Sequence, residues 1–215
     1  MGALKDAIDG YNEQKRKNVS AEILAAMAQA TEELINSGIE KRTLKSGDTI
    51  HDFELPDQHG QLRRLSDYLC ESRVVLNIYR GGWCPYCNME MKALHDLLPE
   101  IEAAGARLIG MAPETPDRAL TTAERHQIKI DILSDQGNRV AETLGLVFEL
   151  PEALRAIYQK IGIDVPAYNG DDSFKLPLPA TYILEQDGVV LYDFVNADYT
   201  KRLEPEEIVA RLAAL

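Results

Sequence analysis

Two cysteines three residues apart give the sequence its clearest chemical signature. Cys84 and Cys87 follow Trp83 and stand at the start of a run with helical spacing, PYCNMEMKAL. The thiolate is the reactive form of cysteine, and the positive end of a helix lowers the pKa of a thiol placed there. Pro85 suits the first turn of such a helix, and Arg80 adds a positive charge nearby. The spacing therefore predicts a redox-active pair with both sulfurs on one side of the helix.

Other uses of these thiols are less consistent with the sequence. A structural zinc site needs four ligands, and the chain has one CxxC, a distant Cys70 and four scattered histidines without a second paired motif. We therefore expect no bound metal, and we expect no cofactor because sulfur itself would do the chemistry. Two inert buried thiols are the remaining alternative. Cys70 is predicted to be a buried small hydrophobic residue, and a resolving role is its alternative.

Composition excludes several classes of partner. The chain has 215 residues, with 35 acidic against 23 basic side chains and a net charge of −12, which argues against nucleic acid. No apolar run approaches the ~18 residues of a membrane span, so we expect no membrane association. The first residues lack the continuous apolar segment of a secretory signal. Three cysteines are too few for a disulfide scaffold and favour a reducing compartment, so we predict a cytoplasmic protein.

The elements around the pair alternate between strands and helices. Apolar runs predict strands over 74–79, 106–112 and 130–135, and ATYILEQDGVVLYDFV predicts a hairpin that turns at Asp187 and Gly188. Helical patterns separate these runs and close the chain. The order implies an α/β fold whose mixed sheet is flanked by helices on both faces. The CxxC would then follow a central strand, where α/β sheets carry their chemistry.

The N-terminal region has a different character. Apolar residues with helical spacing, with Ser20 as N-cap and Gly38 after the last turn, predict a helical extension over residues 1–41. The sheet domain would occupy residues 42–215. The extension could pack on that domain or serve as a dimerisation arm, since an apolar stripe shows only that something covers it.

Two further segments carry structural predictions. Pro99 lies inside the helical pattern that follows the CxxC and should kink or divide that helix. Residues 163–178, with their NGDD and prolines, read as an irregular insertion.

Three stretches together resemble the peroxiredoxin (alkyl hydroperoxide reductase/thiol-specific antioxidant) family with a thioredoxin-style CxxC. VVLNIYRGGWCPYC is similar to the active-site strand and loop of thioredoxin-fold proteins. LKSGDTIHDFELPDQHGQLRRLSDYL resembles the N-terminal hairpin of the peroxiredoxins, and LPATYILEQDGVVLYDFV resembles the late strands of that superfamily. The resemblance covers roughly residues 44–215 and implies a thioredoxin-like, peroxiredoxin-type fold.

The peroxiredoxin pattern PxxxTxxC implies one assignment of roles. With Tyr79 aligned, its peroxidatic cysteine falls on Cys87, its threonine on Cys84 and its proline on Arg80. The family's later arginine falls on or near Pro179. The threonine and arginine that hold the peroxide oxygens in the family are therefore missing at the matching positions.

The thioredoxin pattern implies the opposite order of attack. It matches Trp83, both cysteines, and Pro179 as the cis-proline that faces the disulfide. Cys84 would then be the exposed attacking thiol and Cys87 the resolving one. Both patterns end in a Cys84–Cys87 disulfide, so the order of attack stays open.

The resemblance implies a thiol-dependent peroxidase that reduces hydrogen peroxide or organic hydroperoxides. A thioredoxin- or glutathione-type thiol would recycle it, and a homodimer is expected from family habit. A thioredoxin-like thiol–disulfide oxidoreductase with little peroxidase activity is the first alternative. A non-enzymatic redox sensor on the same fold is the second.

Overall fold

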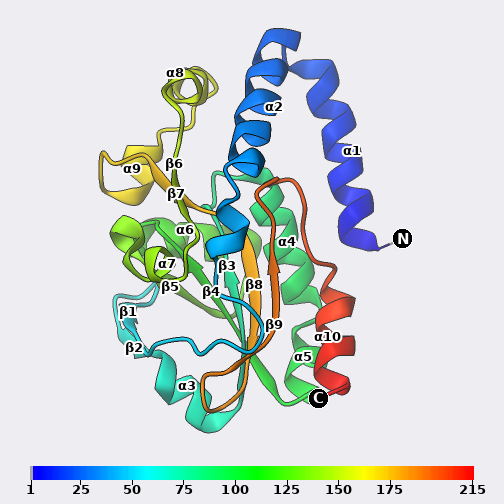
Figure 1. Cartoon of the computed structure of the whole chain (residues 1–215), viewed down its shortest axis with the longest axis vertical. Coiled ribbons are helices and arrows are strands. Elements are labelled where there is room, and N and C mark those ends of the chain that lie inside the picture. Colours follow the sequence, from blue (N-terminus) through cyan, green and yellow to red (C-terminus); the bar gives the residue numbers. More distant parts are fainter. Residues whose placement is uncertain (1) are drawn as a thin grey trace.

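A five-stranded mixed sheet forms the centre of the molecule (Figure 1). The computed structural model describes residues 2–215, and the strand order across this sheet is β5-β4-β3-β8-β9. The strands span β3 Arg73–Ile78, β4 Ala106–Ala112, β5 Asp131–Ser134, β8 Ala180–Leu184 and β9 Val190–Val195. Strands β3, β4 and β5 are parallel, whereas β8 pairs antiparallel with both β3 and β9. The predicted mixed sheet is confirmed.

Strand β3 is the middle strand of the sheet, and its side chains are covered on both faces. Apolar residues along its whole length suit this position. Val75 packs in a cluster with Leu94 and Ile208, while its neighbour Leu76 packs on the opposite face with Leu65. This alternation is the period of two that a strand imposes on its side chains. The carboxyl end of β3 then leads directly to the CxxC.

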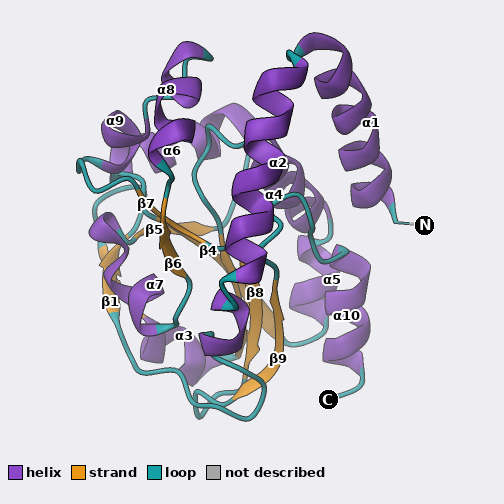
Figure 2. Ribbon diagram, turned by 45° about the horizontal axis from the view of Figure 1, so that its top comes forward, coloured by secondary structure: helices purple, strands orange, loops and turns teal. Residues whose placement is uncertain are grey.

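Helices cover both faces of the sheet (Figure 2). Helices α4, α5 and α10 lie on one side, and α3 and α7 lie on the other. The helices after the N-terminal region span α3 Leu65–Glu71, α4 Pro85–Asp96, α5 Leu98–Ala103, α6 Pro116–His126, α7 Arg139–Thr143, α8 Glu152–Lys160, α9 Val165–Asn169 and α10 Pro205–Ala213, with a 3-10 turn η2 Gln136–Asn138 before α7. None of the helices that the structure describes is long and apolar enough to cross a membrane.

Two antiparallel helices and a 3-10 turn precede the sheet: α1 Ala3–Asn18, α2 Ala21–Asn36 and η1 Ile39–Arg42. The Ser20 hydroxyl accepts a hydrogen bond from the backbone N–H of Ile23, and Gly38 adopts a left-handed φ of 69° after α2, as predicted. Helix α1 packs on α4. Met27 of α2 packs against Leu154 of α8, so this chain itself covers the apolar stripe. The division of the chain after residue 41 stays a prediction.

The predicted break at Pro99 is confirmed. Helix α4 ends at Asp96, and α5 begins at Leu98 with Pro99 in its first turn, where the missing N–H costs no hydrogen bond. The predicted hairpin is confirmed as well, since β8 and β9 pair around a turn in which Gly188 has a φ of 85°.

The prediction that residues 163–178 are irregular is wrong. This segment contains α9, whose Asp164 side chain accepts from the N–H of Ala167, and the strand β7. The small sheets consist of β1 Glu54–Pro56 with β2 Leu62–Arg64, and of β6 Val147–Glu149 with β7 Lys175–Pro177. A three-residue strand is too short to show an alternation of apolar and polar residues in the sequence. Strands β6 and β7 can therefore be recognised only from their pairing in the structure.

Candidate active site

The CxxC begins α4 after a tight glycine loop. Cys84 is the N-cap of α4, and its N–H donates to the carbonyl of Gly81 at 3.0 Å. The N–H of Gly82 donates to Oε1 of the buried Glu114 at 2.9 Å. A Cβ atom on Gly82 would lie 1.9 Å from the Thr122 hydroxyl oxygen, so only glycine fits there. These contacts place both cysteines in the first turn of α4, as predicted.

Both cysteines are free thiols, and both are buried. Cys84 is 2% exposed and Cys87 is 0% exposed, so the prediction of an exposed Cys84 is wrong. Burial acts to raise the pKa of Cys84, but a hydrogen bond from Cys87 and the charges of Arg80 and Arg202 lower it to about 5. Burial and the neighbouring Cys84 raise the pKa of Cys87. These shifts favour a thiolate on Cys84 and a protonated thiol on Cys87.

Arg80 is a buried cation with three aromatic neighbours. It is 2% exposed, and its Nη2 donates to the Tyr158 hydroxyl at 2.8 Å. The guanidinium carbon lies 4.8 Å from the ring centre of Trp83 and 4.7 Å from that of Tyr199, within cation–π range. Its Nε has no hydrogen-bond partner, and no carboxylate within residues 2–215 forms a salt bridge with it. Its charge thus acts on Cys84 without being neutralised.

A second arginine, Arg202, has a buried side chain and contacts Cys87. Nη2 of Arg202 lies 3.3 Å from Cys87 Sγ, and its Nε lies 2.8 Å from Oε2 of Glu90, which is 2% exposed. Burial raises the pKa of Glu90 to about 7, although Arg202 opposes this shift. The expectation of a site without a peroxiredoxin-type arginine is therefore incomplete, because a guanidinium from a later loop reaches the pair.

The sequence analysis missed both members of this ion pair. Glu90 follows Cys87 by three residues and precedes Leu94 by four, so its spacing put it on the buried face of α4. This spacing could have identified Glu90 as a buried carboxylate beside the cysteines. Arg202 lies between β9 and α10 in a loop without periodicity, and nothing in the sequence pointed to it.

The other predicted site residues are Trp83, Pro85, Pro179 and Cys70, and the structure confirms only some of the predictions about them. Trp83 is half-buried and stacks edge-on against Tyr158, with ring centres 5.7 Å apart. Pro85 is the first residue of α4. No peptide bond among residues 2–215 is cis, so the prediction of a cis Pro179 is wrong. Cys70 is exposed on α3, so its predicted burial is also wrong, because the last turn of this short helix turns it to solvent.

Helix α1 contributes polar contacts above the pair. The hydroxyl of Tyr86 donates to Asn12 Oδ1 at 2.6 Å, and Nζ of Lys15 donates to the hydroxyl of Tyr199 at 3.2 Å. Tyr86 and Tyr199 pack edge to face, with ring centres 5.4 Å apart. The first helix thereby contacts Tyr86, which lies within the CxxC, and Tyr199 in the loop after β9.

A cavity of about 180 Å³ opens beside Arg80, and we call it the α2–α8 cavity. Its walls come from α2, from β6 and α8, from the residues before β8 and from the loop after β9. The lining residues are Ala30, Thr31, Glu33, Leu34, Ser37, Arg80, Phe148, Glu149, Leu150, Pro151, Leu154, Tyr158, Leu178, Pro179, Ala197 and Tyr199. It is the cavity into which both Arg80 and Pro179 open.

Comparisons with known proteins agree on one family. The profile of the AhpC/TSA family matches residues 46–193. Peroxiredoxin Bcp of Escherichia coli K12 is 31% identical over 103 residues, which are 48% of this chain and 65% of that protein. The crystal structure of peroxidoxin BcpB from Mycobacterium tuberculosis superposes with a TM-score of 0.63 at 27% identity, covering 80% of this chain and 98% of that one. Peroxiredoxin Q of Xanthomonas campestris, at 16% identity and a TM-score of 0.58, shares the fold.

Proposed function

The chain belongs to the AhpC/TSA family, and on that basis we propose that Cys84 and Cys87 are the working pair of its thiol peroxidase activity. The peroxiredoxin relatives support a thiol peroxidase, and the predicted thioredoxin-like fold is confirmed by the same likeness. The observation that carries the assignment of residues is the position of two buried thiols at the start of α4 between two buried arginines. Such an environment stabilises a thiolate, which is the nucleophile that peroxide reduction requires.

Cys84 makes the first attack in this proposal. Its thiolate attacks the terminal oxygen of ROOH, the S–O bond forms, and the O–O bond breaks. The leaving alkoxide takes the proton of the Cys87 thiol and departs as ROH. Cys84 is then a sulfenic acid, and Cys87 is a thiolate that the charge of Arg202 stabilises.

Cys87 completes the reaction. Its thiolate attacks the sulfenic sulfur of Cys84, a disulfide forms, and hydroxide leaves and is protonated to water. The two thiols have then been oxidised by two electrons, and the peroxide has been reduced to ROH and water. Two electrons from a thioredoxin- or glutathione-type thiol would restore the pair. A cytoplasmic location and a homodimer are further parts of this proposal.

A thiol–disulfide oxidoreductase is the second candidate function. The low pKa of Cys84 next to Trp83 favours it, because a thiolate at a helix N-terminus also attacks disulfides. The burial of both sulfurs opposes it, because a disulfide on a large protein cannot reach them in this conformation.

Stopped-flow tryptophan fluorescence separates these functions, since Trp83 is the only tryptophan of the chain. The pre-reduced protein is mixed with hydrogen peroxide, with cumene hydroperoxide and with a small model disulfide. Fast oxidation by a peroxide supports the peroxidase. Slow oxidation by both peroxides together with fast exchange with the disulfide supports the oxidoreductase. Slow reactions with all three would favour a non-enzymatic redox sensor.

A further inference from the structure

We infer that the α2–α8 cavity binds a small monocarboxylic acid with an apolar body, and that this ligand competes with the Cys84 thiolate for the charge of Arg80. The inference goes beyond the proposed function, because neither the binding nor the competition needs a peroxide. The ligand has no need to touch a sulfur atom, and neither cysteine of the pair lines the cavity within the described residues.

The anchor of the site is the buried cation Arg80, which lines the cavity and is 2% exposed. Within residues 2–215, Nη2 is the one guanidinium nitrogen with a hydrogen-bond partner, the Tyr158 hydroxyl, and no carboxylate pairs with this cation. A buried charge without a counter-ion is costly, and the rings of Trp83 and Tyr199 offset this cost only in part. A bound carboxylate would supply the missing counter-ion, since its two oxygens match the donors of a guanidinium.

The walls of the cavity suit an apolar body the size of one ring. Apolar side chains line it, among them Leu34, Phe148, Leu150, Leu154 and Leu178. Its volume is about 180 Å³, and an apolar cavity of about 150 Å³ is large enough to bind benzene. The space therefore admits one six-membered ring next to the carboxylate, and burial of that ring adds the hydrophobic contribution.

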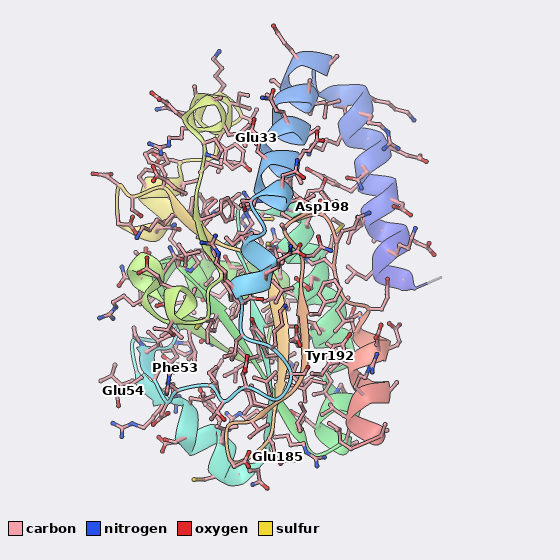
Figure 3. All side chains as sticks on the ribbon, in the orientation of Figure 1. Glu33, Phe53, Glu54, Glu185, Tyr192 and Asp198 are labelled. Atoms are coloured by element: carbon pink, nitrogen blue, oxygen red, sulfur yellow. The ribbon has the colours of Figure 1, made fainter. Side chains whose placement is uncertain are left out.

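The rim carries two carboxylates that limit the ligand to a single negative charge. Glu33 and Glu149 line the cavity and are exposed, and Figure 3 shows Glu33 on the side of α2 that faces α8. Arg155 pairs with Glu149, and Gln29 donates a hydrogen bond to Glu33. Exposed charges act through water and are screened, so they repel the ligand several times more weakly than the buried guanidinium attracts it. A second carboxylate at the rim would meet only repulsion.

Arg80 connects the cavity to the cysteine pair. Burial opposes ionisation of Cys84, but the hydrogen bond from Cys87 and the charge of Arg80 lower its pKa. A carboxylate on Arg80 would neutralise part of that charge, so the thiolate would be less stable while the ligand is bound. The coupling is reciprocal, and the ligand binds more weakly while Cys84 is ionised. Oxidation of Cys84 removes the thiolate, so the oxidised protein should bind the acid more tightly than the reduced protein.

One wall of the site lies outside the part of the chain that matches the family. The family profile begins at residue 46, whereas Ala30, Thr31 and Leu34 come from α2. The site therefore requires the N-terminal helices of this chain in addition to the shared domain.

A binding measurement tests the site and the ligand class. Cyclohexanecarboxylate is the probe, cyclohexanecarboxamide is its uncharged control of the same shape, and each is titrated into the reduced protein by NMR near pH 7. The acid should shift signals of α2 and α8 and bind about tenfold or more tightly than the amide. Equal affinities for the two compounds would overturn the role of the Arg80 charge.

Three variants locate the binding. Ala30→Phe fills the cavity from α2 and should lose the acid, whereas Ala25→Phe, at an exposed position of the same helix outside the cavity, should bind it like the wild type. Arg80→Met should remove the advantage of the acid over the amide. Binding at wild-type affinity in Ala30→Phe would overturn the cavity as the site, whether or not Arg80→Met folds.

Two further measurements test the competition and must agree with each other. Saturating cyclohexanecarboxylate should raise the midpoint at which the thiolate absorbance of the reduced protein appears, by about one pH unit, and the amide should leave it unchanged. Cys84→Ser has no thiolate at this position and should bind the acid about tenfold more tightly than the reduced wild type, because tenfold in affinity corresponds to one pH unit. Equal affinities together with an unchanged midpoint would overturn the competition.

The proposed function fails separately, in the reaction with peroxides. If no peroxide oxidises the pair but the acid binds and shifts the midpoint, the site stands without the peroxidase. If peroxides oxidise the pair but the acid does not bind, the peroxidase stands and the site is wrong.

Discussion

Arg202 donates from Nη2 to the sulfur of Cys87 across 3.3 Å, although 115 positions separate the two residues in the chain. The same guanidinium pairs through Nε with the buried Glu90. The charge of Arg80 lowers the pKa of Cys84. Both arginines therefore act on the cysteine pair, and they differ in one respect. Arg202 has a carboxylate partner, whereas Arg80 has aromatic rings and an open cavity beside it.

Arg202→Met should destabilise the protein strongly. The substitution leaves Glu90 buried without its counter-ion, and breaking a buried ion pair in this way costs about 3–5 kcal/mol. Urea unfolding measures the loss. The double variant Arg202→Met/Glu90→Leu should recover most of it because no buried charge remains. The control Arg211→Met removes an exposed helical ion pair with Glu207 and should leave the unfolding midpoint unchanged. Equal losses in the single and double variants would contradict this account.

The reduced protein should ionise one thiol at low pH. The pKa of Cys84 is lowered to about 5, so the ultraviolet absorbance of the thiolate should rise with pH around a midpoint near 5. Below that pH the thiolate is protonated, and the rate of peroxide reduction should fall with it. Arg80→Met removes one of the stabilising charges and should raise the midpoint. A wild-type midpoint near the ordinary thiol value of about 8.5 would refute the ionised pair.

The two cysteine variants should stop the reaction at different stages. Cys87→Ser keeps the attacking thiolate, so one peroxide should produce a sulfenic acid on Cys84 that reacts with dimedone, and no disulfide can follow. Cys84→Ser should give no fast reaction with peroxide. Cys70→Ser is the matched control and should retain turnover, because Cys70 is exposed on α3. Dimedone labelling of Cys87 in Cys84→Ser, at the wild-type rate of oxidation, would reverse the order of attack.

Glu114 should make folding stability depend on pH. Burial raises its pKa to about 7 from an ordinary value of 4.5, so between these values the folded state holds a proton that the unfolded state has lost. The free energy of unfolding should therefore fall as pH rises from about 4.5 to about 7, by up to about 3 kcal/mol. Glu114→Gln keeps an oxygen that can accept from Gly82 and should reduce this slope, whereas the contribution of Glu90, whose pKa burial also raises to about 7, should remain. Urea unfolding across this pH range measures it, with the exposed Glu100→Gln as the control that leaves the slope unchanged.

Local sequence patterns were sufficient to predict the sheet and the place of the CxxC. The apolar runs at β3 and β4, the Asp187–Gly188 turn and Pro99 act on their own neighbourhood, so one stretch of sequence contains the whole signal. The surroundings of the cysteines could not be predicted in the same way. The burial of Arg80 depends on Tyr158 and Tyr199, which lie 78 and more positions away in other elements. Arg202 comes from a loop, where no periodicity indicates which way a side chain points.

Helix α1 is synthesised long before two of the residues that it contacts. Lys15 meets Tyr199 across 184 positions, and Gly2 to Lys5 approach the carboxylate of Glu204. At about 5–20 residues per second, the ribosome needs on the order of ten to forty seconds to deliver these partners. During that interval α1 can pack on α4, but it lacks its contacts with the loop after β9. These contacts of α1 are therefore completed only after Tyr199 and Glu204 have been synthesised, so a translation product that stops before Tyr199 would carry a less enclosed CxxC.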